Sequence, residues 1–201
     1  MIEIRIHGRG GQGNVVAAYL LASAAFAEGA HCQAFPSFGA ERRGAPVTAF
    51  VRIAPGPILA RSQVRNPAAL IVQDDSLLHI PGTAAGLLKG GGVLVNAPED
   101  AATLSARHGL DILSLPATAL ALEYLGRPTP NVALLAAFLT VTGLFPLSAL
   151  SKALGERFSG EVLRRNEKLV ARAAEAVPEG AWANRLVLEQ PTKEARRAES
   201  A

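Results

Sequence analysis

Cysteine is almost absent from the sequence, which has Cys32 alone among 201 residues. This excludes an intramolecular disulfide and a cysteine-rich cluster site within the chain. The four histidines show no ligand spacing, and there is neither a serine elbow nor a cysteine–histidine pair at a helix start. The residues therefore predict no catalytic group and no metal site of the chain's own.

Charged and aromatic residues are also scarce, at 18% and 5% of the sequence. The net charge is +3, but the basic residues are scattered and form no run with interleaved aromatics. This pattern argues against a nucleic-acid partner. Hydrophobic residues make up 49%, which predicts a packed globular domain with part of its surface covered by a partner.

The distribution of apolar residues predicts one domain over residues 1–183. Residues 184–201 turn polar, and we expect a frayed end or an arm on a neighbouring subunit. No signal-peptide pattern opens the sequence, and charges, glycine or proline interrupt every long apolar stretch. We therefore expect no membrane span and a cytoplasmic location.

Strand and helix patterns alternate along the chain. Strands are predicted over residues 1–7, 31–35, 47–53, 69–73, 93–96 and 110–115. Helices are predicted over residues 13–28, 117–126, 131–143, 147–158 and 160–177, with a further short helix within 84–90. This order predicts an α/β fold: a three-layer Rossmann-like domain with a mostly parallel sheet and a helical C-terminal part.

A glycine cluster lies between the first strand and the first helix, in HGRGGQGNVVAAYLL (7–21). Gly8, Gly10 and Gly13 fit the pattern G-x-G-x-x-G. Glycine allows close backbone approach, and the first turn of a helix offers unpaired N–H groups with a partial positive charge. We predict a site for phosphate, pyrophosphate or carboxylate. The alternative is a tight turn in which the glycines serve packing only.

Two common nucleotide sites do not fit this loop. A dinucleotide site needs an acid at the end of the second strand to bind the ribose hydroxyls, but that strand ends in QAFPSFG. Glu28 precedes the strand and Glu41 follows in the next loop. A P-loop is excluded because no Lys-Ser or Lys-Thr pair follows the glycines.

A second unusual stretch is PSFGAERRGAP (36–46). The planar fork of an arginine such as Arg42 or Arg43 suits a carboxylate or phosphate, from a ligand or a partner. The alternative is a solvated loop in which Glu41 pairs with an arginine. Further along the chain, we interpret Asp74 and Asn131 as helix caps rather than catalytic groups.

Three stretches carry a resemblance to a known family: IRIHGRGGQGNVVAAYLLASAAF, CQAFPSFGAERRGAPVTAFVRI and NVALLAAFLTVTGL. Over about residues 2–175 the chain resembles the gamma subunit, or fused gamma domain, of 2-oxoacid:ferredoxin oxidoreductases. The form FGAERRGAPV is most similar to the pyruvate/ketoisovalerate branch, since Ala45 stands where the 2-oxoglutarate branch tends to carry glycine. Ala40 departs from the proline of many members.

The resemblance implies an oxygen-sensitive complex with alpha, beta and delta-type partner subunits. Such a complex decarboxylates a 2-oxoacid on thiamine diphosphate with Mg, passes electrons through [4Fe-4S] clusters to ferredoxin, and releases an acyl-CoA. This sequence has neither a G-D-G…N stretch nor a C-x-x-C series, so those groups are expected on other chains. We expect a homo-oligomer when the chain is isolated.

The resemblance also implies an assembly role and a part in coenzyme A handling near the thiamine site. From the anion-binding chemistry above, we predict that residues of the two motifs approach the coenzyme A diphosphate or the active-site cleft. These residues are Gly8, Gly10, Gly11, Gln12, Gly13, Ser37, Phe38, Gly39, Glu41, Arg42, Arg43 and Gly44. Two alternatives stay open. One is a stand-alone module of the same fold that binds a phosphorylated metabolite, and the other is a structural subunit whose motifs serve an interface.

Overall fold

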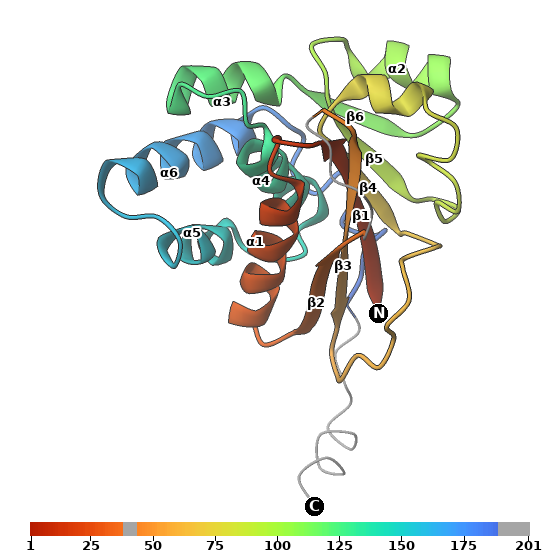
Figure 1. The fold of residues 1–201 in the computed structure, drawn as a ribbon, viewed down its shortest axis with the longest axis horizontal. Coiled ribbons are helices and arrows are strands. Elements are labelled where there is room, and N and C mark those ends of the chain that lie inside the picture. Colours follow the sequence, from red (N-terminus) through yellow and green to blue (C-terminus); the bar gives the residue numbers. More distant parts are fainter. Residues whose placement is uncertain (38–43, 189–201) are drawn as a thin grey trace, which may run out of the picture.

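The computed structural model describes residues 1–37 and 44–188. A six-stranded sheet lies between two layers of helices (Figure 1). The strands are β1 (Ile2–Arg9), β2 (His31–Pro36), β3 (Pro46–Ala54), β4 (Ala69–Val72), β5 (Gly92–Asn96) and β6 (Ile112–Leu115). The helices are α1 (Asn14–Ala27), the 3-10 helix η1 (Asp75–His79), α2 (Ala101–His108), α3 (Ala117–Leu125), α4 (Asn131–Thr142), α5 (Leu147–Gly155) and α6 (Gly160–Glu175). The predicted three-layer α/β fold is confirmed.

The strand order is β2-β3-β1-β4-β5-β6. Strand β3 runs antiparallel to both β1 and β2, and the other neighbouring pairs are parallel. All the described strands except β3 therefore end at the same edge of the sheet. The chain enters β3 at that edge, and Gly44 and Ala45, which precede β3, lie next to the glycine loop that follows β1.

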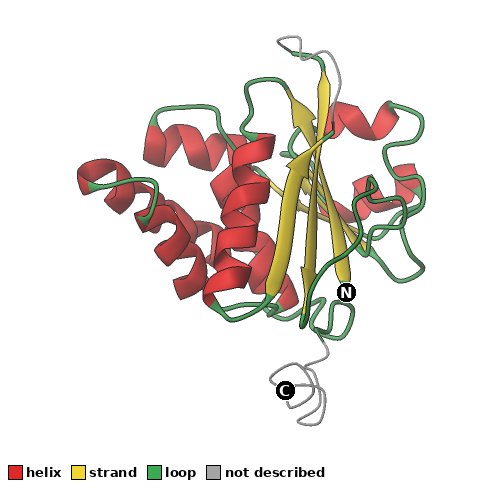
Figure 2. Cartoon of the chain, turned by 60° about the horizontal axis from the view of Figure 1, so that its bottom comes forward, coloured by secondary structure: helices red, strands yellow, loops and turns green. Residues whose placement is uncertain are grey.

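The two faces of the sheet are buried against different layers, because side chains alternate along each strand. Ile4 and Ile6 of β1 face a large core with α1 and α4, whereas Leu70 and Val72 of β4 face a smaller core with η1 and α2. Figure 2 shows more helices on one side of the sheet than on the other. The helices of the C-terminal part of the sequence, α3 to α6, belong to this larger layer.

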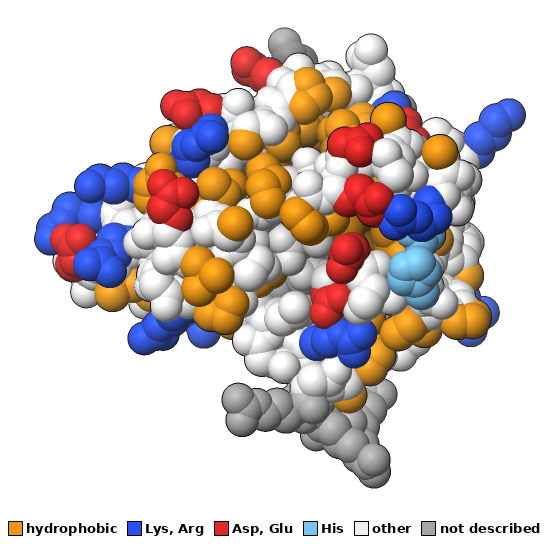
Figure 3. Space-filling model, turned by 90° about the horizontal axis from the view of Figure 1, so that it is seen from above, with side chains coloured by type: hydrophobic (Ala, Val, Ile, Leu, Met, Phe, Trp, Pro, Cys, Tyr) orange, Lys and Arg blue, Asp and Glu red, His pale blue; other side chains and the backbone are white. Residues whose placement is uncertain are grey.

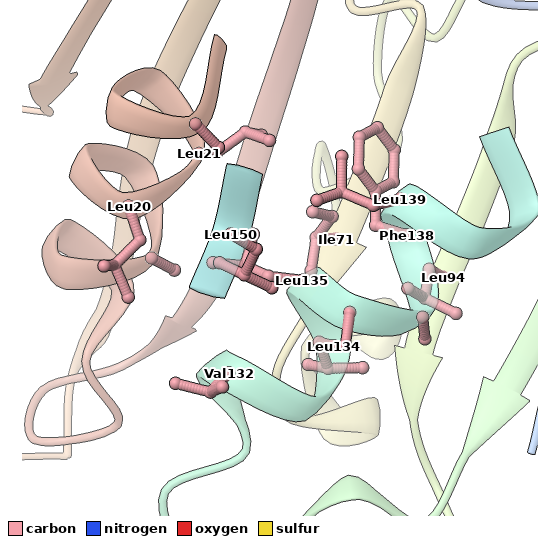
Figure 4. Packing of buried hydrophobic residues seen from close by; sticks show 14 of the residues in the cluster. Leu20, Leu21, Ile71, Leu94, Val132, Leu134, Leu135, Phe138, Leu139 and Leu150 are labelled. Carbon is pink, nitrogen blue, oxygen red and sulfur yellow. The ribbon is translucent and has the colours of Figure 1, made fainter. Parts of the chain in front are cut away.

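Helix α4 is apolar on all sides because it lies inside this layer. Eleven of its residues are buried. Figure 4 shows Leu135 and Phe138 of α4 close to Ile71 of β4 and Leu21 of α1. Each such side chain contributes about 1.5–3 kcal/mol through removal from water. No helix within the described ranges has the length and hydrophobicity that crossing a membrane requires.

Between β4 and β6 one prediction is wrong and one helix was not predicted. The short helix expected within 84–90 is a series of turns, in which Gly86 and Gly90 have positive φ angles that break a helix. Helix α2 was not predicted because only Leu104 is buried, so its apolar periodicity is weak. Its start is fixed by Asp100, whose side chain accepts the Thr103 N–H at 2.9 Å.

The chain after α6 packs back onto the core. The Trp182 side chain is buried against Gly92, and the Trp182 backbone N–H donates to the Val141 carbonyl at 2.7 Å. Leu186 is also part of the large core. A domain boundary at residue 183 stays a prediction, and residues 189–201 of the expected tail lie outside the described residues.

Candidate functional site

The glycine loop is closed by its own backbone and by Gln12. The Gln12 N–H donates to the Arg9 carbonyl at 3.0 Å, and the Arg9 N–H donates to Gln12 Oε1 at 2.7 Å. Gly11 lies at the tip with φ +99°, and a β-carbon there would meet no described atom within 4 Å. Gly11 therefore borders open space in a conformation that favours glycine.

Gly8 and Gly13 are required for packing. A β-carbon on Gly8 would overlap the Asn14 amide, and one on Gly13 would lie 2.5 Å from Asn131 Nδ2. Gly13 also has φ +81° where it begins α1. The packing alternative thus explains Gly8 and Gly13 of the G-x-G-x-x-G pattern, while Gly11, which is not one of its three glycines, stays available to approach a ligand.

The second motif meets the glycine loop through backbone hydrogen bonds. The Gly10 N–H donates to the Ala45 carbonyl at 3.0 Å, and the Gly44 N–H donates to the Gly10 carbonyl at 3.4 Å. Ser37 extends β2, where its N–H donates to the Thr48 carbonyl at 2.7 Å. The structure therefore brings Gly10 and Gly44 together at the carboxyl edge of the sheet. The remaining predicted residues, Phe38, Gly39, Glu41, Arg42 and Arg43, lie outside the described residues.

Arg9 was missed by the sequence reasoning, although its place between two glycines was a signal. Its Nε donates to Asp74 Oδ2 at 2.7 Å, its Nη2 to Ser76 Oγ at 2.7 Å and its Nη1 to the Gly44 carbonyl at 3.1 Å. One side chain thus joins the glycine loop, the second motif and the end of β4.

Asp74 is the N-cap of η1, as predicted, and accepts the Ser76 N–H at 3.1 Å. Burial acts to raise the pKa of Asp74, but the hydrogen bonds from Ser76 and Arg9 and the charge of Arg9 outweigh it. The pKa therefore lies below its usual value. Asp74 stays ionised near neutral pH and holds Arg9 in place.

The start of α1 borders a cavity. Among the described residues no side chain caps this helix, and its first turn has no acidic residue. Gly13 lines a cavity of about 510 Å³ together with residues of α4 and α6. The first-turn N–H groups lack acceptors within the helix, so an anion is favoured at this end.

Asn131 is not the N-cap of α4, contrary to the prediction. Pro130 has that position, and Asn131 is the first helical residue. Its Oδ1 accepts the Val132 N–H at 2.9 Å and its Nδ2 donates to the Gly13 carbonyl at 3.4 Å. Asn131 therefore ties the start of α4 to the start of α1.

Buried polar groups lie beneath the loop on both faces of the sheet. His7 Nδ1 is 3.3 Å from the Thr48 hydroxyl, and its buried Nε2 has no partner among the described residues. Burial, and then the charge of Arg5, lower the pKa of His7 to about 4, so the ring is neutral at pH 7. Gln73 is fully buried, and neither atom of its amide has a partner within the described part of the chain.

The strand order gives a second reason against a dinucleotide site. Strand β3 lies between β1 and β2. The end of β2 is therefore one strand removed from the glycine loop, whereas a dinucleotide fold places its ribose-binding acid on the strand next to β1.

The described residues do not fit the metal groups implied by the resemblance. No group of three or more His, Cys, Asp or Glu side chains gathers within residues 1–37 and 44–188. Cys32 is half-buried, its thiol donates to the Ala22 carbonyl at 3.2 Å, and burial raises the pKa of that thiol. This sulfur is therefore held as a thiol and is poorly suited to ligate a cluster.

Comparison with known proteins identifies the family. The sequence profile of the family "Pyruvate ferredoxin/flavodoxin oxidoreductase" matches residues 3–176. The chain belongs to this family. It is 45% identical over 178 residues to the pyruvate/ketoisovalerate oxidoreductases common subunit gamma of Thermococcus litoralis, a match that covers 87% of this chain and 96% of that protein.

Two other members of the oxidoreductase family are similar to this chain over most of its length. Pyruvate synthase subunit PorC of Methanothermobacter marburgensis is 48% identical over 166 residues, which are 83% of this chain and 92% of that protein. The crystal structure of pyruvate oxidoreductase subunit PORC of Thermotoga maritima superposes with a TM-score of 0.78 at 38% identity, covering 88% of this chain and 97% of that one. The resemblance to gamma subunits is confirmed, and the chain is an oxidoreductase subunit rather than a complete enzyme.

Proposed function

We propose that this chain is the gamma subunit of a complex that oxidatively decarboxylates a 2-oxoacid, with pyruvate as the foremost substrate, and forms an acyl-CoA. Relatives named for pyruvate and ketoisovalerate support this substrate class. Alpha, beta and delta-type subunits hold the thiamine diphosphate, Mg and [4Fe-4S] clusters, and ferredoxin accepts the electrons. The lack of suitable ligands among this chain's described residues supports that division.

Within this complex, the chain assists assembly and forms part of the cleft that binds coenzyme A. The observation that carries this proposal is the backbone hydrogen bond from Gly10 to Ala45, which joins the glycine loop to the second motif at one edge of the sheet. The first turn of α1 and the guanidinium groups of Arg42 and Arg43 supply positive potential for the coenzyme A diphosphate. These groups bind and orient the substrate and transfer no proton or electron.

The proposal is tested by producing the chain under anaerobic conditions together with its partner subunits. We expect CoA-dependent pyruvate oxidation that reduces ferredoxin, and none from this chain alone. We expect Arg42→Ala and Arg43→Ala each to raise the apparent KM for CoA. Arg61→Ala is the control, because Arg61 is exposed and outside both motifs. If both motif variants kept the CoA KM and the turnover of the unmodified complex, the CoA role would be lost.

The cavity at the start of α1 also favours a second candidate, a stand-alone module that binds a phosphorylated metabolite. An isolated monomer that binds such a metabolite and retains no partner subunit would support this candidate. A purely structural subunit is distinguished by its variants, since motif variants would then disturb assembly and turnover together.

In a cell we expect the chain in the cytoplasm, within this hetero-oligomer. When its partners are missing, we expect homo-oligomers, because the sequence is 49% hydrophobic.

A further inference from the structure

The cavity of about 510 Å³ at the start of α1 is a groove between the start of α1, the end of α3 and the start of α6. We call it the α1–α6 groove. Its apolar lining consists of Val16, Leu125, Val132, Phe158 and Val162. A lining of this kind accepts one or two apolar side chains.

Apolar side chains continue outside the groove. Tyr19 of α1 and Leu122 of α3 do not line the groove and are 48% and 49% exposed, and Val162 at the groove is 53% exposed. Helix α1 has no charged residue between Asn14 and Ala27, although a surface helix normally carries a polar outer face. Because the apolar surface extends past the cavity along the helices, it fits a polypeptide better than a small molecule.

The rim of the groove carries unbalanced positive charge. Arg127, Arg157 and Arg165 line it with a single acid, Glu161. Glu161 is already paired with Arg164 at 2.7 Å and with Arg165 at 3.1 Å. Arg127 and Arg157 form no ion pair with any residue in the described ranges, so their charges are available to a partner.

Figure 3 shows the molecule from above. Basic side chains gather on the lobe at the left, which Figure 1 identifies as the region of α6, and hydrophobic side chains lie beside it. Apolar and basic surfaces are thus contiguous on this face, as expected for an interface with an apolar centre and a charged rim.

Asn166 adds a directional contact. It is 3% exposed, and its Nδ2 donates to the Val162 carbonyl at 2.8 Å. Its Oδ1 accepts no hydrogen bond from the described residues, and the residue lines the groove. This oxygen is free to accept an N–H donor from whatever occupies the groove.

We propose that the α1–α6 groove docks an acidic amphipathic segment of another subunit. Its apolar side chains enter between Val16 and Val162, and its carboxylates pair with Arg127 and Arg157. A second copy of this chain fits less well, because a two-fold contact would place one basic rim against the other. This inference rests on the proposed function, since it presupposes that the chain assembles with other subunits.

The test compares charge and polarity changes inside and outside the groove, in the complex produced with all its subunits. The groove variants are Val162→Asp and the double variant Arg127→Glu with Arg157→Glu. The controls are Leu59→Asp and Arg61→Glu, which alter exposed residues outside the groove. We expect each groove variant to weaken binding of this chain to its partner subunits about tenfold or more, and the controls to bind normally.

Two further measurements separate a loss of docking from a loss of folding and identify the partner segment. The isolated groove variants should melt at the temperature of the unmodified chain, because the altered residues are exposed and make no core contact. A photoreactive amino acid in place of Val162 should cross-link to a partner peptide that contains both acidic and apolar residues. Mass spectrometry of the cross-linked peptide identifies it.

Several results would overturn the inference. Normal assembly of the groove variants would do so, as would a cross-link to a second copy of this chain or to a basic peptide. If the unmodified chain binds no partner subunit, the proposed function fails as well. If the unmodified chain and the groove variants assemble equally, only the docking inference fails.

Discussion

Arg9 and Asp74 form an ion pair, with Nε 2.7 Å from Oδ2, that joins the loop after β1 to the end of β4. The two residues are 65 positions apart in the sequence. Because Arg9 also donates to the Gly44 carbonyl, the same guanidinium positions Gly44 of the second motif. The geometry of the candidate site therefore depends on a contact that neither motif contains by itself.

Replacing Arg9 by alanine should loosen this connection. The pair is partly exposed, so we expect a loss of only about 1 kcal/mol in the free energy of unfolding. We expect a larger effect on the complex, in which the KM for CoA rises because the loop is no longer fixed. Urea unfolding and steady-state kinetics measure the two effects. Arg107→Ala removes an exposed pair with Glu99 away from the site; equal CoA kinetics in the two variants would contradict the role of Arg9.

His7 should make the stability of the chain depend on pH. Its folded-state pKa of about 4 lies below the usual 6.5, so the unfolded chain binds the proton more readily between these values. Stability is therefore complete above pH 6.5 and falls as the pH drops toward 4. The expected loss is about 2 kcal/mol between pH 7.5 and pH 5. Arg5 and Thr48 are the charged and hydroxyl groups that contact or influence the ring.

The measurement is urea unfolding at the two pH values. His7→Gln should remove most of the difference, whereas the exposed His31→Gln should retain it. A pH dependence unchanged in the His7 variant would show that other groups cause it.

Gln73 should be replaceable by an apolar residue without loss of stability. Both of its amide atoms are buried without a partner among the described residues. Gln73→Met keeps the length and removes two unsatisfied polar atoms, so we expect stabilisation of about 1–3 kcal/mol. Asn96→Leu is the opposite case and should destabilise the chain. The Asn96 Nδ2 donates to the Gln73 backbone carbonyl and to the Thr118 hydroxyl, and its Oδ1 accepts the Thr118 N–H. A less stable Gln73 variant in thermal unfolding would contradict this reasoning.

Much of the fold could be predicted because local patterns carry it. The alternation in β1 and the apolar runs of β4 and β5 are visible in a short window of sequence, and the structure confirms them. The reversed direction of β3 could not be predicted, because alternation sets which face a side chain takes but not which way the strand runs. Helix α2 was not predicted, because a cap and one buried leucine give only a weak periodic signal in the sequence.

The candidate site also has features that the sequence shows and features that it does not. The glycines of the loop could be recognised because strand, loop and helix are adjacent in sequence. The N-cap role of Asp74 could be recognised as well, but its contact with Arg9 and the contact of Asn131 with Gly13 could not, because each joins segments that only the sheet and its helices bring together. Sequence spacing contains no information on such pairs.

The central claim is that the open tip of the glycine loop approaches coenzyme A. Gly11 and Gly29 both have positive φ and open space around the Cα, so alanine should cost about 1 kcal/mol of stability at either position. Only Gly11 lies in the loop. The most direct measurement is the apparent KM for CoA of the assembled complex with each variant. We predict a rise of about tenfold for Gly11→Ala, with the KM for pyruvate unchanged, and no change for Gly29→Ala. A CoA KM that is equal in the two variants would contradict the claim.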